Sequence, residues 1–307
     1  MTTDTPALDL DEILTASQLP ALPQSALRLL QISQDEEAGA TELAATIESD
    51  LGLASQVLRF ANSSYFGFSR AVSSVKGAVA LVGMRTIKSF VLWSAVFAAV
   101  PDPKCGPFRL QRLWEDSLRR ALFARDLVSA FDSNVADDAF AAALLQDMAI
   151  PLLCRGAPAQ YARLLEARDR SGTRLSALER AAFGWTHADA AKRMARLWRL
   201  PETVAVAVGG HLDIDRWVAC CASHPTELAV AMSALLASEA DPCQPESALL
   251  ENHYQRLVPA AGPALATLLG QVDDEFLELA PLLKAGDPGD SPAERPQEAR
   301  RGGRPRR

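Results

Sequence analysis

Apolar residues recur at intervals of three and four along most of the chain, the spacing that places side chains on one face of an α-helix. The clearest stripe consists of Val75, Ala78, Val79 and Val82, with serines before it and Gly83 after it. Such serines can accept hydrogen bonds from the first helical turn, and such a glycine can end the helix. No stretch shows the strict alternation of a strand. The pattern therefore predicts an all-α protein.

Caps and breakers give the expected helices their limits. Asp50 can cap a helix that begins at Leu51, Thr41 can cap the helix before it, and Ser73 or Ser74 the helix after it. Proline ends some segments and opens others. The helices expected are 24–33, 41–49, 51–61, 75–82, 85–100, 108–131, 139–145, 157–169, 176–183, 187–198, 201–211, 225–238, 245–257 and 263–283.

Composition narrows the class of protein. The chain has 307 residues, enough for one large or two modest domains, and 49% of them are hydrophobic. Its net charge of −7 argues against a body that binds nucleic acid in general. Segment 285–307 lacks apolar residues, so we expect a disordered tail. Its arginines could contact nucleic acid or acidic lipid, but nearby acids offset much of their charge, which favours a solubilising role.

The sequence predicts neither a membrane span nor a signal peptide. The apolar run 89–100 is shorter than the roughly 20 residues that a bilayer requires, and the first 14 residues are acidic. Cys220 and Cys221 are adjacent and could form a strained redox pair. The odd number of cysteines and the absence of a C-x-x-C pair favour reduced thiols in a cytoplasmic protein. The five are Cys105, Cys154, Cys220, Cys221 and Cys243.

The stretch from Ile47 to Leu92 carries a more specific pattern: an acid-capped helix, an Asn-Ser turn, an aromatic–glycine link, a serine pair and a glycine stop. This order resembles the core of the HDOD family, helical signalling domains related to the HD metal-dependent phosphohydrolases. The resemblance extends from about Leu19 to about Leu212. We expect the matching residues to have structural roles. They are Asp50, Leu58, Arg59, Ala61, Asn62, Ser63, Phe66, Gly67, Ser73, Ser74, Ala78 and Gly83.

The resemblance implies a multi-helix domain of two lobes. We expect an HDOD domain over 19–215, with an N-terminal helical lobe at about 19–100 and a C-terminal, HD-like helical lobe at about 108–215. The Pro/Gly-rich loop 101–107 would join them. The other expected segments are an N-terminal lead (1–18), a C-terminal helical extension (216–284) and the tail (285–307).

The resemblance also indicates where an HD site would lie. HD phosphohydrolases hold a divalent metal with a His, an adjacent His-Asp pair and a later Asp, and some bind a second metal through two further His residues. Such a metal lowers the pKa of bound water and polarises a phosphate. In this chain Asp116 stands in place of the first His. Gln146 replaces the His of the pair and precedes Asp147.

The remaining family positions are only partly retained. His187 and His211 match family histidines, but Leu212 replaces the second member of a common His-His pair. Ser233 falls near the position of the last Asp. Each retained residue also has a structural interpretation: a hydrogen bonder at a helix end for Asp147, a first-turn residue after the Thr186 cap for His187, and a helix C-terminal residue for His211.

These departures predict a pseudo-enzyme without catalytic residues, metal or cofactor. We expect a non-enzymatic bacterial signal-transduction or scaffold protein that binds signalling proteins or a small ligand. The resemblance suggests a link to response regulators or cyclic di-GMP enzymes. A metal-dependent phosphohydrolase or phosphodiesterase with a remodelled site remains the alternative. A regulator that binds nucleic acid through its tail is a third reading. The oligomeric state is left open.

Overall fold

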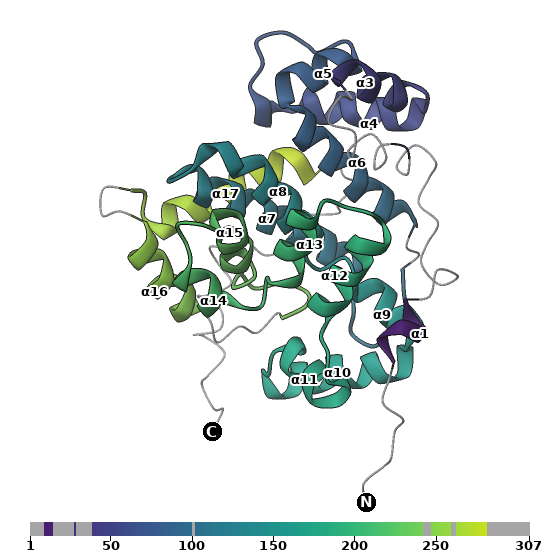
Figure 1. Ribbon diagram of the computed structural model, residues 1–307, viewed down its shortest axis with the longest axis vertical. Coiled ribbons are helices and arrows are strands. Elements are labelled where there is room, and N and C mark those ends of the chain that lie inside the picture. Colours follow the sequence, from purple (N-terminus) through teal and green to yellow (C-terminus); the bar gives the residue numbers. More distant parts are fainter. Residues whose placement is uncertain are drawn as a thin grey trace, which may run out of the picture.

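The computed structural model describes residues 9–14, 28, 39–99, 102–241, 247–258 and 262–280, and every regular element in these ranges is a helix (Figure 1). The all-α prediction is therefore confirmed. The expected helix 24–33 apart from Arg28, most of the lead and the whole tail lie outside the described residues.

The N-terminal lobe is a small group of helices at the top of Figure 1, and α6 runs from this group toward the rest of the molecule. Its interior is apolar and includes Leu43, Ile47 and Val57, all fully buried. Phe60 stacks on Phe90 of α6 with ring centroids 4.1 Å apart, which ties α6 to the group. The elements are α3 (Ala40–Glu48), α4 (Leu51–Ala61), η1 (Ser64–Phe66), α5 (Val75–Val82) and α6 (Met84–Ala99).

Helix ends in this lobe follow local capping chemistry. Asp50 accepts a hydrogen bond from the Leu53 amide at 3.1 Å, and Ser74 rather than Ser73 caps α5 through the Gly77 amide. Gly83 ends α5 with a φ of 98°, a conformation that side-chain-bearing residues rarely adopt. Thr41 is not a cap, because α3 begins one residue earlier, at Ala40.

The C-terminal lobe is built around α7 and α8. The apolar helix α8 is buried over Ala139–Leu145, as its lack of a polar face predicts. It packs on α7, α6, α13 and α15. The elements are η2 (Ser133–Val135), α7 (Leu110–Ser129), α8 (Ala136–Leu145), α9 (Ile150–Gly156), α10 (Pro158–Ser171), α11 (Leu175–Phe183), α12 (His187–Leu197), α13 (Glu202–Gly209), α14 (Ile214–Ala219), α15 (Pro225–Ser233), α16 (Ser247–Leu257) and α17 (Leu265–Leu279).

Elements far apart in sequence complete this lobe. Both α15 and α17 pack directly on α7. An ion pair between Asp11 and Arg193 joins the short helix α1 (Leu10–Ile13) to α12. Helix α15 ends at Ser233, earlier than expected, and residues 234–241 continue as a buried irregular segment. The stretch Ser133–Gly156 is long and apolar enough to cross a membrane, but 89% of it is buried in the protein, as in a core helix.

The Asn62 side chain joins the end of α4 to the segment before α5. Its Nδ2 donates to the carbonyls of Leu58 and Val72, both at 2.8 Å, and its Oδ1 accepts from the Val72 amide at 2.6 Å. Asn62 itself is exposed rather than buried. Ser63 makes only a local bond, from Oγ to the Phe60 carbonyl. Asn62 therefore holds the turn.

Replacing Asn62 tests this role. We expect Asn62→Ala to lower the free energy of unfolding by about 1–2 kcal/mol, because three hydrogen bonds of partly exposed groups are lost. Asn62→Asp keeps the acceptor for the Val72 amide and should cost less. Ser63→Ala is the control and should change stability by under about 0.5 kcal/mol. Urea unfolding measures all three, and equal stabilities for wild type and Asn62→Ala would contradict the assignment.

Candidate metal centre

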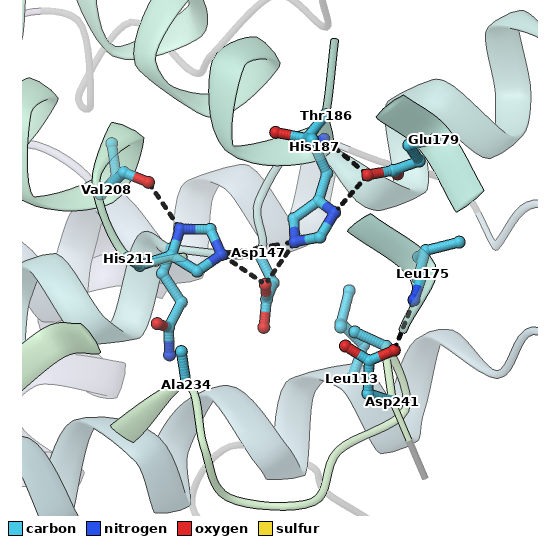
Figure 2. A network of polar contacts seen from close by, with 12 residues as sticks. Leu113, Asp147, Leu175, Glu179, Thr186, His187, Val208, His211, Ala234 and Asp241 are labelled. Atoms are coloured by element: carbon cyan, nitrogen blue, oxygen red, sulfur yellow. Dashed lines mark hydrogen bonds and ion pairs between the residues drawn. The ribbon is translucent and has the colours of Figure 1, made fainter. Parts of the chain in front are cut away.

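Three residues of the HD-like pocket meet at one point inside the C-terminal lobe (Figure 2). Asp147 lies in the turn between α8 and α9, His187 is the first residue of α12, and His211 follows α13. The Nε2 atoms of the two histidines are 3.3 Å apart. Asp147 Oδ1 lies 3.7 Å from His187 Nε2 and 3.6 Å from His211 Nε2. We call these three residues the triad.

Local structure sets the direction of His187. Thr186 and Asp189 form a capping box that starts α12, so the His187 side chain emerges in the first turn. Glu179 of α11 accepts from both the His187 amide, at 2.9 Å, and His187 Nδ1, at 2.7 Å. Tyr161 donates to the other oxygen of the same carboxylate at 3.0 Å. The imidazole is therefore held with Nε2 toward the centre of the triad.

His211 is fixed by the chain just before it. Its Nδ1 donates to the Val208 carbonyl at 2.6 Å, because that carbonyl lies in the last turn of α13 and the neutral ring has one N–H to give. The Gly210 carbonyl accepts from Trp217 Nε1 at 2.7 Å. A Cβ at Gly210 would lie 2.6 Å from that indole ring, so the close approach requires glycine. The second Nε2 thus also points at Asp147.

The electrostatics of the triad follow from burial and from its neighbours. Exposed fractions are 1% for Asp147, 1% for His187 and 2% for His211. Burial lowers the pKa of His211 to about 3, so this ring is neutral. Burial also disfavours the charged form of His187, but Glu179 and Asp147 outweigh it and raise the pKa. Of the two histidines, His187 is therefore the one whose surroundings favour the proton.

Arg120 dominates the other side of Asp147. Its Nη1 lies 2.5 Å from Asp147 Oδ2, and its Nη2 donates to the carbonyls of Ala234 and Leu236 at 3.1 and 2.8 Å. Burial alone would raise the pKa of Asp147, but Arg120, His211 and His187 reverse this and lower it. Asp147 Oδ1 has no hydrogen-bond partner and faces the two imidazoles.

The three facing atoms fit one metal ion. Ligand atoms each about 2.0–2.1 Å from a tetrahedral ion lie roughly 3.3–3.4 Å apart, close to the separations in the triad. Two imidazoles and one carboxylate suit zinc or another first-row metal. Each histidine donates its Nδ1–H to an oxygen, of Glu179 for His187 and of Val208 for His211, which is the arrangement that orients histidine ligands of metals. Asp147, His187 and His211 would hold such an ion, which would polarise a bound water.

The positions for a second ion do not fit. The Arg120 guanidinium pairs with Asp147 Oδ2, so this oxygen is not free to hold a second ion. Gln146 donates to Ser233 Oγ at 3.3 Å, so these two replacements contact each other. Asp116 does not belong to the group that could hold a metal: it accepts from the Glu239 amide at 2.6 Å and lies 4.0 Å from Arg119. A two-metal centre therefore lacks its ligands.

The sequence pointed to Asp147, His187 and His211 but not to Glu179 and Arg120, the two residues whose charged groups pair with His187 and Asp147. Glu179 sits in a Ser-Ala-Leu-Glu pattern that suggested a capping box at Ser176. However, α11 begins at Leu175, and the Glu179 carboxylate points to His187. Arg120 occurs in an arginine pair on a long helix, which is the pattern of a solvated face. A signal existed only for Glu179, which falls on the apolar side of α11.

Removing the Glu179 carboxylate tests the charge pairing. In metal-free protein, Glu179→Gln leaves protonated His187 without its main counterion, so we expect a loss of about 3–5 kcal/mol of stability. Because the folded-state pKa of His187 is raised, its stabilising contribution is fully present below the ordinary histidine pKa of about 6.5 and is lost as pH rises through the raised value. The stability deficit of Glu179→Gln relative to wild type should therefore shrink as the pH rises through the raised pKa of His187.

Urea unfolding between pH 5 and 9 measures the deficit, and histidine NMR titration measures the fall in the His187 pKa. Glu166→Gln is the matched control, because Glu166 is exposed and pairs only with Arg170 on the same helix. A Glu179→Gln deficit that is small, or that grows with pH, would contradict the pairing.

Solved structures share this fold at low identity. An HDOD domain protein with unknown function from Geobacter sulfurreducens has a TM-score of 0.67 and 20% identity, covering 87% of this chain and 92% of that one. A candidate signal transduction protein from Marinobacter aquaeolei VT8 has a TM-score of 0.67 and 22% identity, covering 90% and 62%. A candidate phosphohydrolase from Shewanella amazonensis SB2B has a TM-score of 0.65 and 22% identity, covering 88% and 99%.

This chain also resembles a curated protein, but it spans well under half of that protein's length. An uncharacterized protein of Treponema pallidum (strain Nichols) is 24% identical over 201 residues, which make up 64% of this chain and 38% of that protein. The family model of the HDOD domain matches residues 19–214, well over half of the chain. The resemblance to the HDOD family is thus confirmed, and the chain belongs to the HDOD domain family.

Proposed function

We propose that this HDOD protein is a non-catalytic signal-transduction domain, in which the former HD site has become a structural centre. The observation that carries the proposal is the Arg120–Asp147 ion pair. In a two-metal phosphohydrolase the corresponding carboxylate would serve both ions, whereas here one of its oxygens is committed to a guanidinium. That guanidinium is held by two backbone carbonyls as well, so it is a fixed part of the fold.

Charge balance supports the same conclusion. Asp147 and Glu179 supply two negative charges, and Arg120 and protonated His187 supply two positive ones. The cluster is therefore neutral without an ion. Binding one divalent ion would displace the His187 proton and leave a net charge of about +1 in a buried site, which is costly. Stability thus favours the metal-free arrangement.

The burial of the triad argues against hydrolysis of a substrate at this site. All three triad side chains and Arg120 are at most 3% exposed. A phosphate ester must reach an open metal position in the reaction, and such positions lie in open sites. The proposed role is therefore exerted through the outer surface of the lobes. Its partners would be signalling proteins, including response regulators or cyclic di-GMP enzymes of a bacterial cytoplasm, as HDOD family membership suggests.

One observation favours the alternative, a metal-dependent phosphohydrolase with a single ion. The triad atoms have the spacing of ligands around one tetrahedral ion, and both histidines are oriented through Nδ1 as ligands are. Under this alternative the ion would activate a water molecule. Substrate entry would then require opening of the lobe.

A metal and hydrolysis assay separates the two functions. We expect full-length protein, incubated in turn with zinc, manganese and ferrous ions, to hydrolyse neither bis(p-nitrophenyl) phosphate nor cyclic di-GMP above the rate of buffer with metal. Elemental analysis of protein purified without chelator should give less than about 0.1 ion per chain. An active HD-type phosphodiesterase under the same conditions is the positive control.

The opposite result has a specific form. Metal-dependent hydrolysis that disappears in both Asp147→Asn and His211→Gln, but not in Glu202→Gln, would establish the enzymatic alternative. Glu202 is suited to the control because it is exposed and its carboxylate pairs with Arg196 on the surface. Circular dichroism of each variant confirms that the helices are intact.

A further inference from the structure

The short helix α1 is bound to the body of the protein by one acid and two aliphatic side chains. Asp9 caps α1 by accepting from the Asp11 amide at 2.8 Å. Ile13 and Leu14 are buried and belong to the apolar core. Asp11 Oδ1 lies 2.7 Å from Nη2 of Arg193 on α12. The protein therefore receives α1 through an apolar contact beside a positive charge.

Helix α1 has little of its own to keep it helical or bound. One turn of helix is too short to persist in water without tertiary contacts. Its ion pair is weak, because the Asp11 side chain is 60% exposed and the Arg193 side chain 49% exposed. The surface that receives α1 therefore imposes the helix on it. This is how a groove recognises a short amphipathic helix of another protein.

The face of α12 that pairs with α1 is not fully covered. Arg196 and Leu197 follow Arg193 by three and four positions, which places the three residues on one side of the helix. Leu197 is a large apolar residue, yet it is 47% exposed. Arg196 is exposed and pairs with Glu202. A bound segment longer than α1 would therefore find a further apolar side chain and a further arginine.

We propose that the face of α12 around Arg193 and Leu197 is a docking surface for acidic amphipathic helices of partner proteins, and that α1 occupies it as a built-in competitor. The chemistry of the partner helix follows from that of α1. It has an acid that pairs with Arg193 and, directly after, aliphatic residues that reach the core, as Asp11, Ile13 and Leu14 do. A partner binds by displacing α1.

This proposal rests on the proposed signalling role and gives that role a class of partner. The chain as a whole carries a net charge of −7, so a local basic face is the part of its surface that attracts an acidic segment. His187 of the triad is the first residue of α12. A segment bound at Arg193 therefore contacts a helix that carries a triad residue.

Fluorescence anisotropy with a labelled peptide of residues 7–16 tests the docking surface on the full-length protein. In wild type α1 competes as an attached segment, so we expect weak binding of the peptide. Ile13→Asp combined with Leu14→Asp should release α1 and raise the affinity at least about tenfold. Asp11→Arg is a second opening variant. It sets two positive charges against each other, keeps the apolar contacts and should raise the affinity by a smaller factor.

Charge reversal on α12 tests which residue receives the acid. Added to an opening variant, Arg193→Glu should weaken binding of the peptide roughly fivefold, and a peptide with Asp11→Arg should restore it. Arg163→Glu is the matched control, because Arg163 is an exposed arginine on another helix, α10. It should leave the affinity unchanged. Circular dichroism confirms that each variant keeps its helices.

Three results would overturn the proposal. Neither opening variant binds the peptide more tightly than wild type, or Arg193→Glu and Arg163→Glu have equal effects. The third is a wild-type dimer in light scattering that an opening variant converts to a monomer, because a second copy of the chain would then be the occupant. Peptide binding involves neither metal nor hydrolysis, so its failure would leave the result of the metal and hydrolysis assay as it stands.

Discussion

The buried contact between Arg120 and Asp147 is the interaction on which the C-terminal lobe depends. Arg120 comes from α7, the longest helix, and Asp147 from the turn after α8, so the pair joins the two central helices. Its guanidinium also holds the carbonyls of Ala234 and Leu236, just after α15. Loss of either partner would leave a buried charge, which typically costs about 3–5 kcal/mol.

Buried charged side chains also hold the backbone of the irregular segment 234–241. Turn-like backbone hydrogen bonds serve Ala234, Leu235, Leu236 and Ser238, and the other buried backbone groups of the segment need side-chain partners. Arg168 donates to the carbonyls of Glu239 and Ala240, and Asp116 accepts from the Glu239 amide. Asp241 in turn accepts from the Leu175 amide at the start of α11 (Figure 2). Buried charged side chains here supply hydrogen bonds that a regular helix would make within its backbone, and they connect the segment to α7, α10 and α11.

The limits of several helices could be predicted from the sequence, because they depend on neighbouring residues. Asp50 and Ser74 cap the starts of their helices and Gly83 ends α5, as expected, because a cap depends on residues within one turn. The meeting of Asp147, His187 and His211 came from family resemblance, since no local spacing links residues that lie up to 64 positions apart in the printed sequence. The roles of Arg120 and Glu179 depend on which buried group they face. That is a property of tertiary packing, so a single sequence carries no pattern for it.

Replacing a metal ion by a guanidinium changes how the lobe folds. A metal site is seldom formed in the unfolded chain, so a domain built on it gains its stability only when the ion is supplied. Arg120 carries its positive charge covalently, so this charge does not depend on the supply of an ion. His187 adds a second charge, which Glu179 holds in place. The proposed signalling role would gain from this arrangement, because the fold of the lobe would then be independent of metal supply.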